Sequence, residues 1–539
     1  MRGQSAVKYF NRSLVLGCSL LALSACGPDD IASPGTNGDV TVNVNNSAPT
    51  PTPTPTPSST LVTAAGACPT ITDPQGLKDG GTISGPTGSY RICELPRVIK
   101  ASSTLRKLPG VLYAMNGRVD VGCDGGFSAP GGGGGYASTT VGCGTITSDT
   151  NVTLTIEPGV VVFARTGQSW LAVNRGNKIN AVGTATQPIV FTSSDNVAGF
   201  ATDSTIGQWG GIVLLGRAKI TDCDTGSVAS NTCERDTEGA VDKALFGGND
   251  DTYNAGSIDY IQVRYSGFVL SANKELQSLT LEGVGSGTSL QHFQSHNSSD
   301  DGAEFFGGNF HFKYYISTGA DDDSLDVDTG ARASLQYVLL IQRPGEGDAL
   351  MEIDSNGNEA DTPRTRLRVD NFTGIQTQVS ANNEGADQAS TLFRGNADVT
   401  LLNGVIYTPM NECIRMNGSG TTPATLTTRS VVMSCNATKY IGTGSYTAAQ
   451  VQTMFGSGAN GNDDSLTSTL TGLFVNGANE DGVATFAGSG VDSFFTETPT
   501  PYHIGAAWSG NTAWAAGWTC NSSYADLGGG GSCTSLPTN

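Results

Sequence analysis

A short strand-like pattern recurs in this chain about every two dozen residues, and this repeat limits the possible folds more than any other feature. Each copy reads apolar–polar–apolar, which is typical of a β-strand with one buried face. Successive copies start 24, 22 and 26 residues apart. The copies are Leu279–Glu282, Ala303–Phe306, Leu325–Asp328 and Met351–Asp354.

A second set of strand-like segments lies between the copies of the first set and keeps the same order. Its members start 32, 22 and 23 residues apart, and they are Ile258–Ile261, Leu290–Phe293, Phe312–Tyr315 and Leu335–Val338. Two or three short strands in a repeat of about 22 residues indicate a parallel β-solenoid, in which every coil adds one strand to each of several sheets. An antiparallel sandwich is the alternative, but the Asn-Gly pairs of the chain do not separate these segments as hairpin turns would.

The solenoid fold predicts which side chains lie in columns. Apolar residues at equivalent positions should stack inward, and extra length should be accommodated in turns, such as residues 267–274. The columns predicted to face inward are Leu279, Ala303, Leu325 and Met351, and beside them Leu281, Phe305, Val327 and Ile353.

Several segments resemble the secreted and surface right-handed parallel β-helix lipoproteins of Gram-negative bacteria. They are Leu154–Val160, Val173–Gly176, Ile179–Thr184, Pro188–Ser193, Trp209–Gly216, Ser299–Gly308 and Asp322–Asp326. The resemblance runs from about residue 95 to residues 514–518. It implies an all-β, right-handed parallel β-helix and export from the cytoplasm. It implies no particular activity, because a fold hosts many functions.

The N-terminus is typical of a lipoprotein signal peptide, which we predict to span residues 1–25. Arg2, Lys8 and Arg12 precede an apolar stretch of about ten residues, which is too short to span a membrane. The stretch ends in Leu23-Ser24-Ala25-Cys26, which resembles the bacterial lipobox and implies lipidation of Cys26. An ordinary signal peptide cleaved near this point is the alternative.

The segment after Cys26 is predicted to be a disordered linker over residues 26–60, followed by the β-helix domain over residues 61–539. Proline alternates with threonine from Pro49 to Pro57, which favours a semi-rigid extended spacer. Gly27, by the same resemblance, allows transport to the outer membrane. We therefore expect a lipid-anchored outer-membrane protein, at the cell surface or released into the medium.

Cysteine usage indicates an oxidising compartment. The chain has 12 cysteines, and the ten that follow Cys26 fall as near neighbours with no C-x-x-C motif. We predict sequential disulfides, although the sequence alone does not fix the connectivity. The expected pairs are Cys68 with Cys93, Cys123 with Cys143, Cys223 with Cys233, Cys413 with Cys435, and Cys520 with Cys533.

Acidic residues recur at outward positions of the first set of strands and in the turns before them. Neighbouring strands lie about 4.8 Å apart, so stacked carboxylates repel one another by a few kcal/mol at an effective dielectric constant near 20. A calcium ion would remove this repulsion, because it binds 6 to 8 oxygen ligands in flexible geometry. A solvated acidic face without a specific ion is the alternative. The candidate ligands are Asp300, Asp301, Glu304, Asp322, Asp323, Asp326, Asp328, Glu352 and Asp354.

The same residues could instead form a catalytic cluster. Right-handed β-helices include pectate lyases and polygalacturonase-like hydrolases, which work with aspartates on one sheet. Asp322, Asp323 and Asp326 are the candidates for such a cluster, with Lys313 or Arg332 as the nearest base. No known catalytic motif matches this order of residues.

Aromatic residues occupy one outward position of the second set of strands. Tyr260, Tyr314 and Tyr337, with His292 between the first two, fall at this position once per coil. Such a column could stack on sugar rings, or it could stabilise the sheet by cross-strand stacking.

The net charge of −20 argues against nucleic-acid binding, which requires a basic surface. The leading functional hypothesis is a non-catalytic surface lipoprotein that binds calcium and a glycan or a secreted protein. The alternatives are a polysaccharide lyase or glycoside hydrolase, and an accessory factor for a secreted enzyme or an outer-membrane transporter that type II secretion could export.

Overall fold

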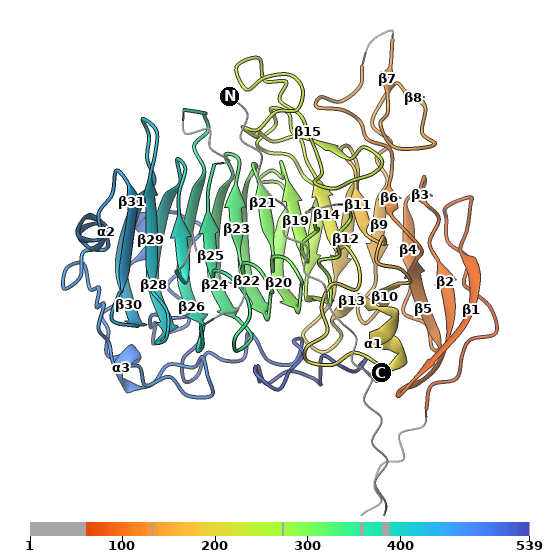
Figure 1. Ribbon diagram of the computed structural model, residues 1–539. Helices are drawn as coiled ribbons and strands as arrows, with labels where there is room; N and C mark the ends of the chain where they lie inside the picture. The colour runs from red at the N-terminus through yellow and green to blue at the C-terminus, as the bar shows by residue number, and fades with distance from the viewer. Residues whose placement is uncertain (1–60, 132–133, 272–273, 356–359, 380–388, 538–539) are drawn as a thin grey trace, which may run out of the picture. The chain divides into compact units, whose positions relative to one another are not determined.

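A computed structural model describes residues 61–131, 134–271, 274–355, 360–379 and 389–537. These residues form the parallel β-helix that the sequence predicts (Figure 1). The signal peptide, Cys26 and the linker predicted over residues 26–60 lie outside the described residues. Within the described residues, no helix is both long and apolar enough to cross a membrane.

One parallel sheet, which we call sheet B, carries the first set of predicted strands. Its register confirms the predicted columns: Leu281, Phe305, Val327 and Ile353 pair in succession, and all four are fully buried. In order across the sheet, its strands are β3 (Val98–Ile99), β6 (Val119–Val121), β11 (Leu171–Val173), β14 (Ile212–Leu215), β19 (Leu279–Glu282), β21 (Glu304–Phe306), β23 (Asp326–Asp328), β25 (Met351–Ile353), β27 (Thr391–Phe393), β29 (Ile414–Gly418) and β31 (Tyr440–Gly444).

The second sheet, sheet A, has 16 strands and carries the second set. Its strands are β1 (Lys78–Gly85), β2 (Gly88–Glu94), β4 (Ser103–Leu105), β5 (Val111–Met115), β9 (Thr153–Ile156), β10 (Val161–Ala164), β12 (Lys178–Val182), β13 (Ile189–Ser193), β17 (Gly256–Asp259), β18 (Ile261–Arg264), β20 (Ser289–His296), β22 (Asn309–Thr318), β24 (Arg332–Ile341), β26 (Arg366–Ile375), β28 (Asp398–Thr408) and β30 (Thr425–Cys435). Two short antiparallel pairs lie outside both sheets: β7 (Tyr136–Ala137) with β8 (Thr145–Ile146), and β15 (Arg235–Asp236) with β16 (Leu245–Phe246).

A column of residues in the left-handed backbone conformation bends each strand of sheet A at the same position. Residues with a positive φ stand in register in seven successive coils, and they are Tyr260, His292, Tyr314, Tyr337, Asn371, Asn403 and Ser430. This conformation costs a non-glycine residue about 1–2 kcal/mol, although asparagine adopts it more readily than most. The bend turns each strand through a corner, so that a coil has three faces: sheet B and the two halves of sheet A.

The ends of the solenoid are covered. Antiparallel β1 and β2 lie at the N-terminal edge of sheet A, and α2 (Ala448–Phe455) packs on β30 and β31 at the other end. Three further short helices are α1 (Ser194–Ala198), α3 (Ala478–Asp481) and the 3-10 helix η1 (Gly488–Gly490). All five predicted disulfides are present, with sequence separations of 10 to 25 residues.

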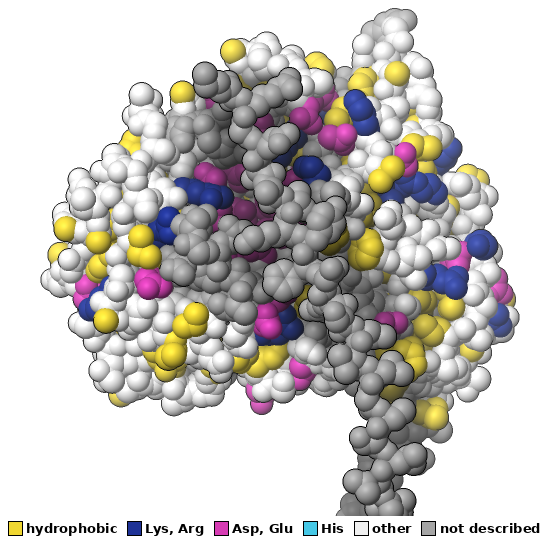
Figure 2. All heavy atoms as spheres, viewed as in Figure 1, with side chains coloured by type: hydrophobic (Ala, Val, Ile, Leu, Met, Phe, Trp, Pro, Cys, Tyr) yellow, Lys and Arg dark blue, Asp and Glu magenta, His cyan; other side chains and the backbone are white. Residues whose placement is uncertain are grey.

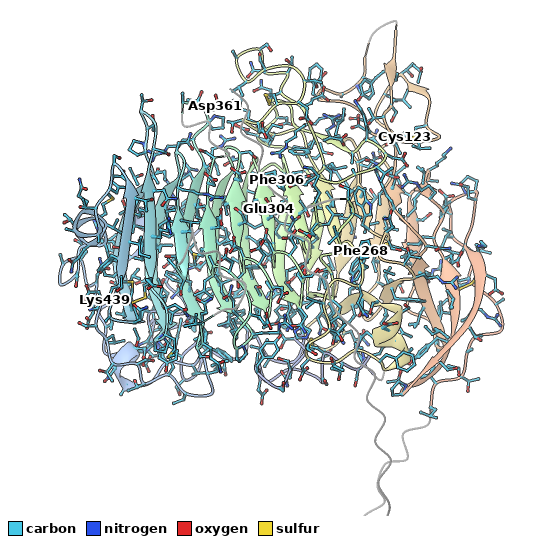
Figure 3. All side chains as sticks on the ribbon, viewed as in Figure 1. Cys123, Phe268, Glu304, Phe306, Asp361 and Lys439 are labelled. Carbon is cyan, nitrogen blue, oxygen red and sulfur yellow. A yellow bond between two sulfur atoms is a disulfide. The ribbon has the colours of Figure 1, made fainter. Side chains whose placement is uncertain are left out.

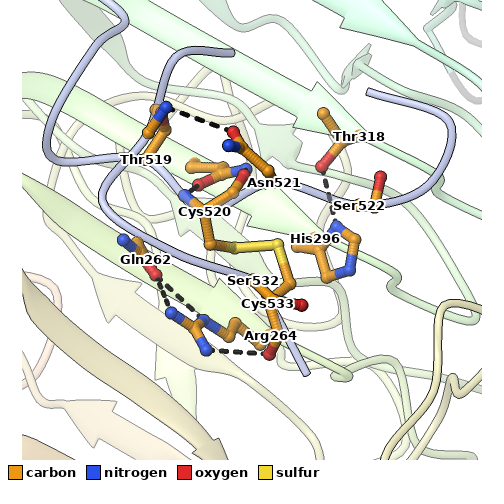
Figure 4. The surroundings of a disulfide bond; sticks show 12 residues. Gln262, Arg264, His296, Thr318, Thr519, Cys520, Asn521, Ser522, Ser532 and Cys533 are labelled. Atoms are coloured by element: carbon orange, nitrogen blue, oxygen red, sulfur yellow. Dashed lines mark hydrogen bonds between the residues drawn. A yellow bond between two sulfur atoms is a disulfide. The ribbon is translucent and has the colours of Figure 1, made fainter. Parts of the chain in front are cut away.

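Residues 462–537, which we call the C-terminal strap, add no further coil. They run back along the outward face of sheet A towards α1 (Figure 1). Gln294 exchanges two hydrogen bonds with the backbone of Cys520, at 3.0 and 2.8 Å. The carbonyl oxygen of Cys533 accepts hydrogen bonds from Arg264 at 2.8 Å and from Asn196 at 3.0 Å. The Cys520–Cys533 disulfide closes this last part of the strap against the sheet (Figure 4).

Candidate functional site

The outward face of sheet B carries the predicted acidic column. Thr280, Glu304, Asp326 and Glu352 pair in succession from β19 to β25, as their spacing predicts. Glu304 and Phe306 are the two outward residues of β21 (Figure 3), whereas Phe305 between them points into the core. The alternation of side chains along a strand therefore puts a carboxylate outside each of three successive coils.

Turn residues join this column to form an acidic pocket of about 270 Å³. Figure 2 shows the acidic side chains in magenta, gathered near the middle of this face with basic side chains beside them. Residues of loop 217–250 and residues 274–277 meet at the rim, where the ammonium of Lys274 lies 2.6 Å from a carboxylate oxygen of Glu238. The lining residues are Glu238, Lys274, Glu275, Gln277, Asp300, Asp301, Glu304, Asp322, Asp323, Asp326, Asp348, Glu352 and Arg394.

Carboxylate oxygens in the pocket lie close enough to share a metal ion. Four groups of three residues each offer oxygens that lie within 4.8 Å of one another. The groups are Asp300, Asp301 and Asp322; Asp301, Glu304 and Asp326; Asp322, Asp323 and Asp348; and Asp323, Asp326 and Glu352. The pocket is therefore able to bind a cation through its own side chains.

Hydrogen bonds between coils hold the turn carboxylates in place. Asp301 accepts the backbone N–H of Asp323 at 3.0 Å, and Asp323 in turn accepts the N–H of Ala349 at 2.6 Å. Asp300 accepts a hydrogen bond from the amide of Gln277 at 3.1 Å. The contact between Asp301 and Asp323 thus recurs one coil further on between Asp323 and Ala349, and these contacts fix the turns of successive coils relative to one another.

Two carboxylates of the column lack full hydrogen bonding among the described residues. Glu304 is 8% exposed, and its carboxylate forms no hydrogen bond or ion pair with any described residue. Oδ1 of Asp326 is also inaccessible and has no hydrogen-bond partner among the described residues. Burial, and then the charges of neighbouring carboxylates, raise the pKa of Glu304 and of Asp326 well above the usual range. Groups that disfavour their own ionisation in this way are stabilised as anions by a divalent cation.

Basic residues at the pocket differ from those expected. Arg394 forms ion pairs with Glu352 and, at 2.7 Å, with Asp354. Lys313 instead lies on β22 of sheet A, 3.2 Å from Thr496, and Arg332 pairs with Asp251 at 2.6 Å. Neither of the two bases that the sequence offers for a lyase reaction therefore faces the acidic pocket.

Two predicted metal ligands, Asp328 and Asp354, belong to none of the four carboxylate groups. Asp328 lies two residues beyond Asp326 on β23, and Asp354 follows β25 and pairs with Arg394. Neither residue lines the acidic pocket. The pocket instead includes Asp348, Glu238 and Glu275, which the predicted ligand set does not contain. Asp348 stands before its strand much as Asp322 does, a signal that is present in the sequence, whereas Glu238 and Glu275 come from loops that do not follow the repeat.

Glu282 precedes Phe306 and Asp328 in a second outward column of sheet B, and it is fully buried beneath loop 217–250. Its Oε2 lies 2.6 Å from the hydroxyl of Thr237, and that hydroxyl also lies 3.0 Å from the carbonyl oxygen of Ala244. A protonated Glu282 can donate to Thr237 while Thr237 donates to Ala244, so this geometry suits the neutral acid. Burial raises the pKa of Glu282 to about 8.

We expect Glu282→Gln to stabilise the protein at pH 9 by a few kcal/mol and to have much less effect at pH 5. Because the pKa of Glu282 is higher in the folded state, the wild-type protein loses stability as the pH rises from the unfolded-state pKa of 4.5 to the folded-state pKa of about 8. Glutamine keeps the donor to Thr237 and cannot ionise. Urea unfolding at both pH values measures the difference, with Glu346→Gln on an outer loop as the control. An equal effect at both pH values would show that Glu282 is not neutral in the fold.

The aromatic residues of the second set stack on one another as a column. Tyr260 lies 4.0 Å from His292 between ring centroids, His292 lies 4.3 Å from Tyr314, and Tyr314 lies 5.2 Å from Tyr337. Tryptophans of the C-terminal strap pack against the column, namely Trp508, Trp514 and Trp518. Tyr337 is only 2% exposed, so it is too buried to stack on a glycan. The column instead forms part of the contact between sheet A and the strap.

A comparison with protein families gives one match. A family model described as a pectate-lyase-like β-helix domain matches residues 140–519, which is more than half of the chain and includes the acidic pocket. No curated protein matched the chain. No solved structure matched it either.

Proposed function

Because the chain belongs to the pectate-lyase-like β-helix domain family, we propose that its acidic pocket binds calcium and, through it, a carboxylated glycan at the bacterial surface. The observation that carries the proposal is the buried carboxylate of Glu304, which lines the pocket without a partner among the described residues. Calcium suits these ligands because it binds several carboxylate oxygens in flexible geometry, whereas magnesium demands a near-ideal octahedron.

The glycan part of the proposal depends on the coordination positions of calcium that three protein carboxylates leave unoccupied. Calcium takes 6 to 8 oxygens, so an ion bound by three carboxylates keeps positions for water or for a carboxylate of the ligand. The pocket is lined almost entirely by polar side chains, and its rim includes Lys274 and Arg394. A glycan array probed with the full-length protein in calcium and in chelator tests this part. Binding to acidic glycans that does not depend on calcium would contradict it.

The location is proposed from the lipobox at Cys26 and the Pro/Thr linker, which would hold the domain away from the outer membrane. Lipidation is tested by fatty-acid labelling, and a Cys26→Ser variant that keeps the label would contradict it.

Calcium is expected to raise the melting temperature of the detergent-solubilised full-length protein, and chelation should reverse this shift. An ion at 100 times its Kd stabilises a folded protein by about 2.7 kcal/mol. Asp326→Asn should remove most of the response, because Asp326 belongs to two of the four carboxylate groups. Asp328→Asn is the matched control, because it lies on the same strand outside the pocket. Equal losses in the two variants, or no response to calcium in the wild type, would contradict calcium binding here.

A polysaccharide lyase is the second candidate, favoured by the guanidinium of Arg394 among the carboxylates of the pocket. A lyase should release unsaturated oligosaccharides from an acidic polysaccharide, and Arg394→Lys should abolish this release while the melting response to calcium remains. If a polysaccharide binds and no product is released, the lyase candidate is excluded and the non-catalytic proposal stands.

A further inference from the structure

Five arginine side chains are buried in the part of the chain that the structure describes, and one of them lacks an acidic partner there. Arg118, Arg175, Arg217 and Arg343 each form an ion pair with an aspartate. Arg264, on β18, is 2% exposed and forms no ion pair with any described residue. A charge is rarely buried in a protein without a counterion, because burial removes its hydration.

Neutral acceptors hold the guanidinium of Arg264 instead. Its Nε donates to Oε1 of Gln262 at 2.9 Å, and its Nη2 donates to the same oxygen (Figure 4). Its Nη1 donates to the carbonyl oxygens of Cys533 and Ser535, at 2.8 and 2.7 Å. These contacts use four of the five N–H groups of a guanidinium, so one N–H of Nη2 has no acceptor among the described residues.

A pocket of about 380 Å³ lies beside this guanidinium, between sheet A and the C-terminal strap. Gln262 and Arg264, both 2% exposed, form its inner end. Thr186, Ser532 and Ser535 are exposed and place hydroxyl groups at its mouth. The volume is near the lower end of the usual range for small-molecule sites, so the pocket suits one small molecule better than a chain of sugars.

We propose that this pocket binds a small hydroxy acid whose carboxylate lies on Arg264. A guanidinium forms strong, charge-assisted hydrogen bonds with carboxylates, and the remaining N–H of Nη2 would supply one. The hydroxyl groups at the mouth can each donate and accept, which suits the hydroxyl groups of such a ligand. Pro188 and Leu536 also line the pocket and would cover the C–H groups of the ligand.

The charges around the pocket favour an anion over a neutral ligand. None of the described residues that line it is acidic. Burial lowers the pKa of Arg264 to about 10. Burial alone would also lower the pKa of Arg175, but Asp124 and Glu234 raise it above its ordinary value. A bound carboxylate would stabilise the charged form of Arg264 in the same way as these acids stabilise that of Arg175.

This pocket is separate from the acidic pocket. It lies on the outward face of sheet A, and the two pockets share no lining residue. The inference therefore does not rest on calcium binding, and a chelator can be present when it is tested.

Calorimetric titration of the detergent-solubilised full-length protein in chelator tests the proposal, with gluconate as the ligand and sorbitol as its uncharged counterpart. We expect gluconate to bind and sorbitol, which lacks the carboxylate, to bind roughly tenfold more weakly or less, the effect of losing a hydrogen bond to a charged group. Arg264→Gln should abolish gluconate binding, and Ser535→Ala should weaken it several-fold. Ser509→Ala, at an exposed position of the strap outside the pocket, is the control and should keep the wild-type affinity.

Each other outcome overturns the proposal. No gluconate binding by the wild type would contradict it directly, and equal affinities for gluconate and sorbitol would exclude recognition of the carboxylate. Wild-type affinity in Arg264→Gln or in Ser535→Ala would place the ligand elsewhere. Ser535→Ala keeps the carbonyl oxygen that Arg264 binds, so it remains decisive even if Arg264→Gln loosens the strap. The calcium response of the melting temperature tests the acidic pocket separately, so the failure of one proposal leaves the other intact.

Discussion

Replacing Phe305 with alanine is expected to lower the free energy of unfolding by about 3–5 kcal/mol, the usual cost of removing a buried phenylalanine ring. Phe305 is fully buried inside the coil that carries Glu304. Its ring meets that of Phe310 edge to face at 5.0 Å between centroids and lies 6.5 Å from that of Phe312. The core around it is built of stacked strands on all three faces, so the cavity can collapse only partly.

Urea unfolding measures this loss, and two variants calibrate it. Phe305→Leu should cost less, because leucine fills part of the same space. Phe200→Ala should change stability by at most about 0.5 kcal/mol, because Phe200 is 75% exposed after α1. Similar losses at positions 305 and 200 would show that Phe305 does not lie in the core.

Replacing Arg175 with methionine is expected to lower the free energy of unfolding by about 3–5 kcal/mol, because it breaks a buried ion pair. Arg175 is fully buried and joins three segments of the chain. Its guanidinium donates two hydrogen bonds to Asp124, at 2.7 and 2.9 Å, and a third to Glu234 at 2.7 Å. Burial alone would raise the pKa of Asp124, but Arg175 holds it below its usual value. Methionine would leave this buried carboxylate without a compensating charge.

A double variant tests that explanation. Adding Asp124→Asn to Arg175→Met removes the uncompensated charge, so part of the stability should return. Arg91→Met is the control, because Arg91 forms a surface ion pair with Asp79 at 3.2 Å, and such pairs contribute about 1 kcal/mol or less. If Arg175→Met costs no more than Arg91→Met, the buried ion pair does not hold these segments together.

The repeat made the columns of sheet B predictable from the sequence. Glu304, Asp326 and Glu352 were expected in register because one strand per coil fixes which residues are neighbours, and the observed pairing is the expected one. The near-neighbour disulfides were predictable for a similar reason, since each closes a loop of 25 residues or fewer in sequence.

Contacts that do not follow the repeat were not predictable. Arg394 reaches Glu352 from 42 residues further along the chain, and Lys274 meets Glu238 between two irregular loops. The aromatic column illustrates the same limit. Its register was evident from the spacing of Tyr314 and Tyr337, but the tryptophans that cover it come from a strap without strand periodicity.

The C-terminal strap changes how such a molecule should unfold. In a simple solenoid each coil contacts only its neighbours, so the ends can fray while the middle persists. Here the amide of Asn196 donates to the carbonyl oxygen of Cys533, across 337 residues of sequence, and Gln294 is bound to Cys520 in the same way. The strap ties the coils that carry Asn196 and Gln294 to Cys533 and Cys520. The domain should therefore melt as one cooperative body.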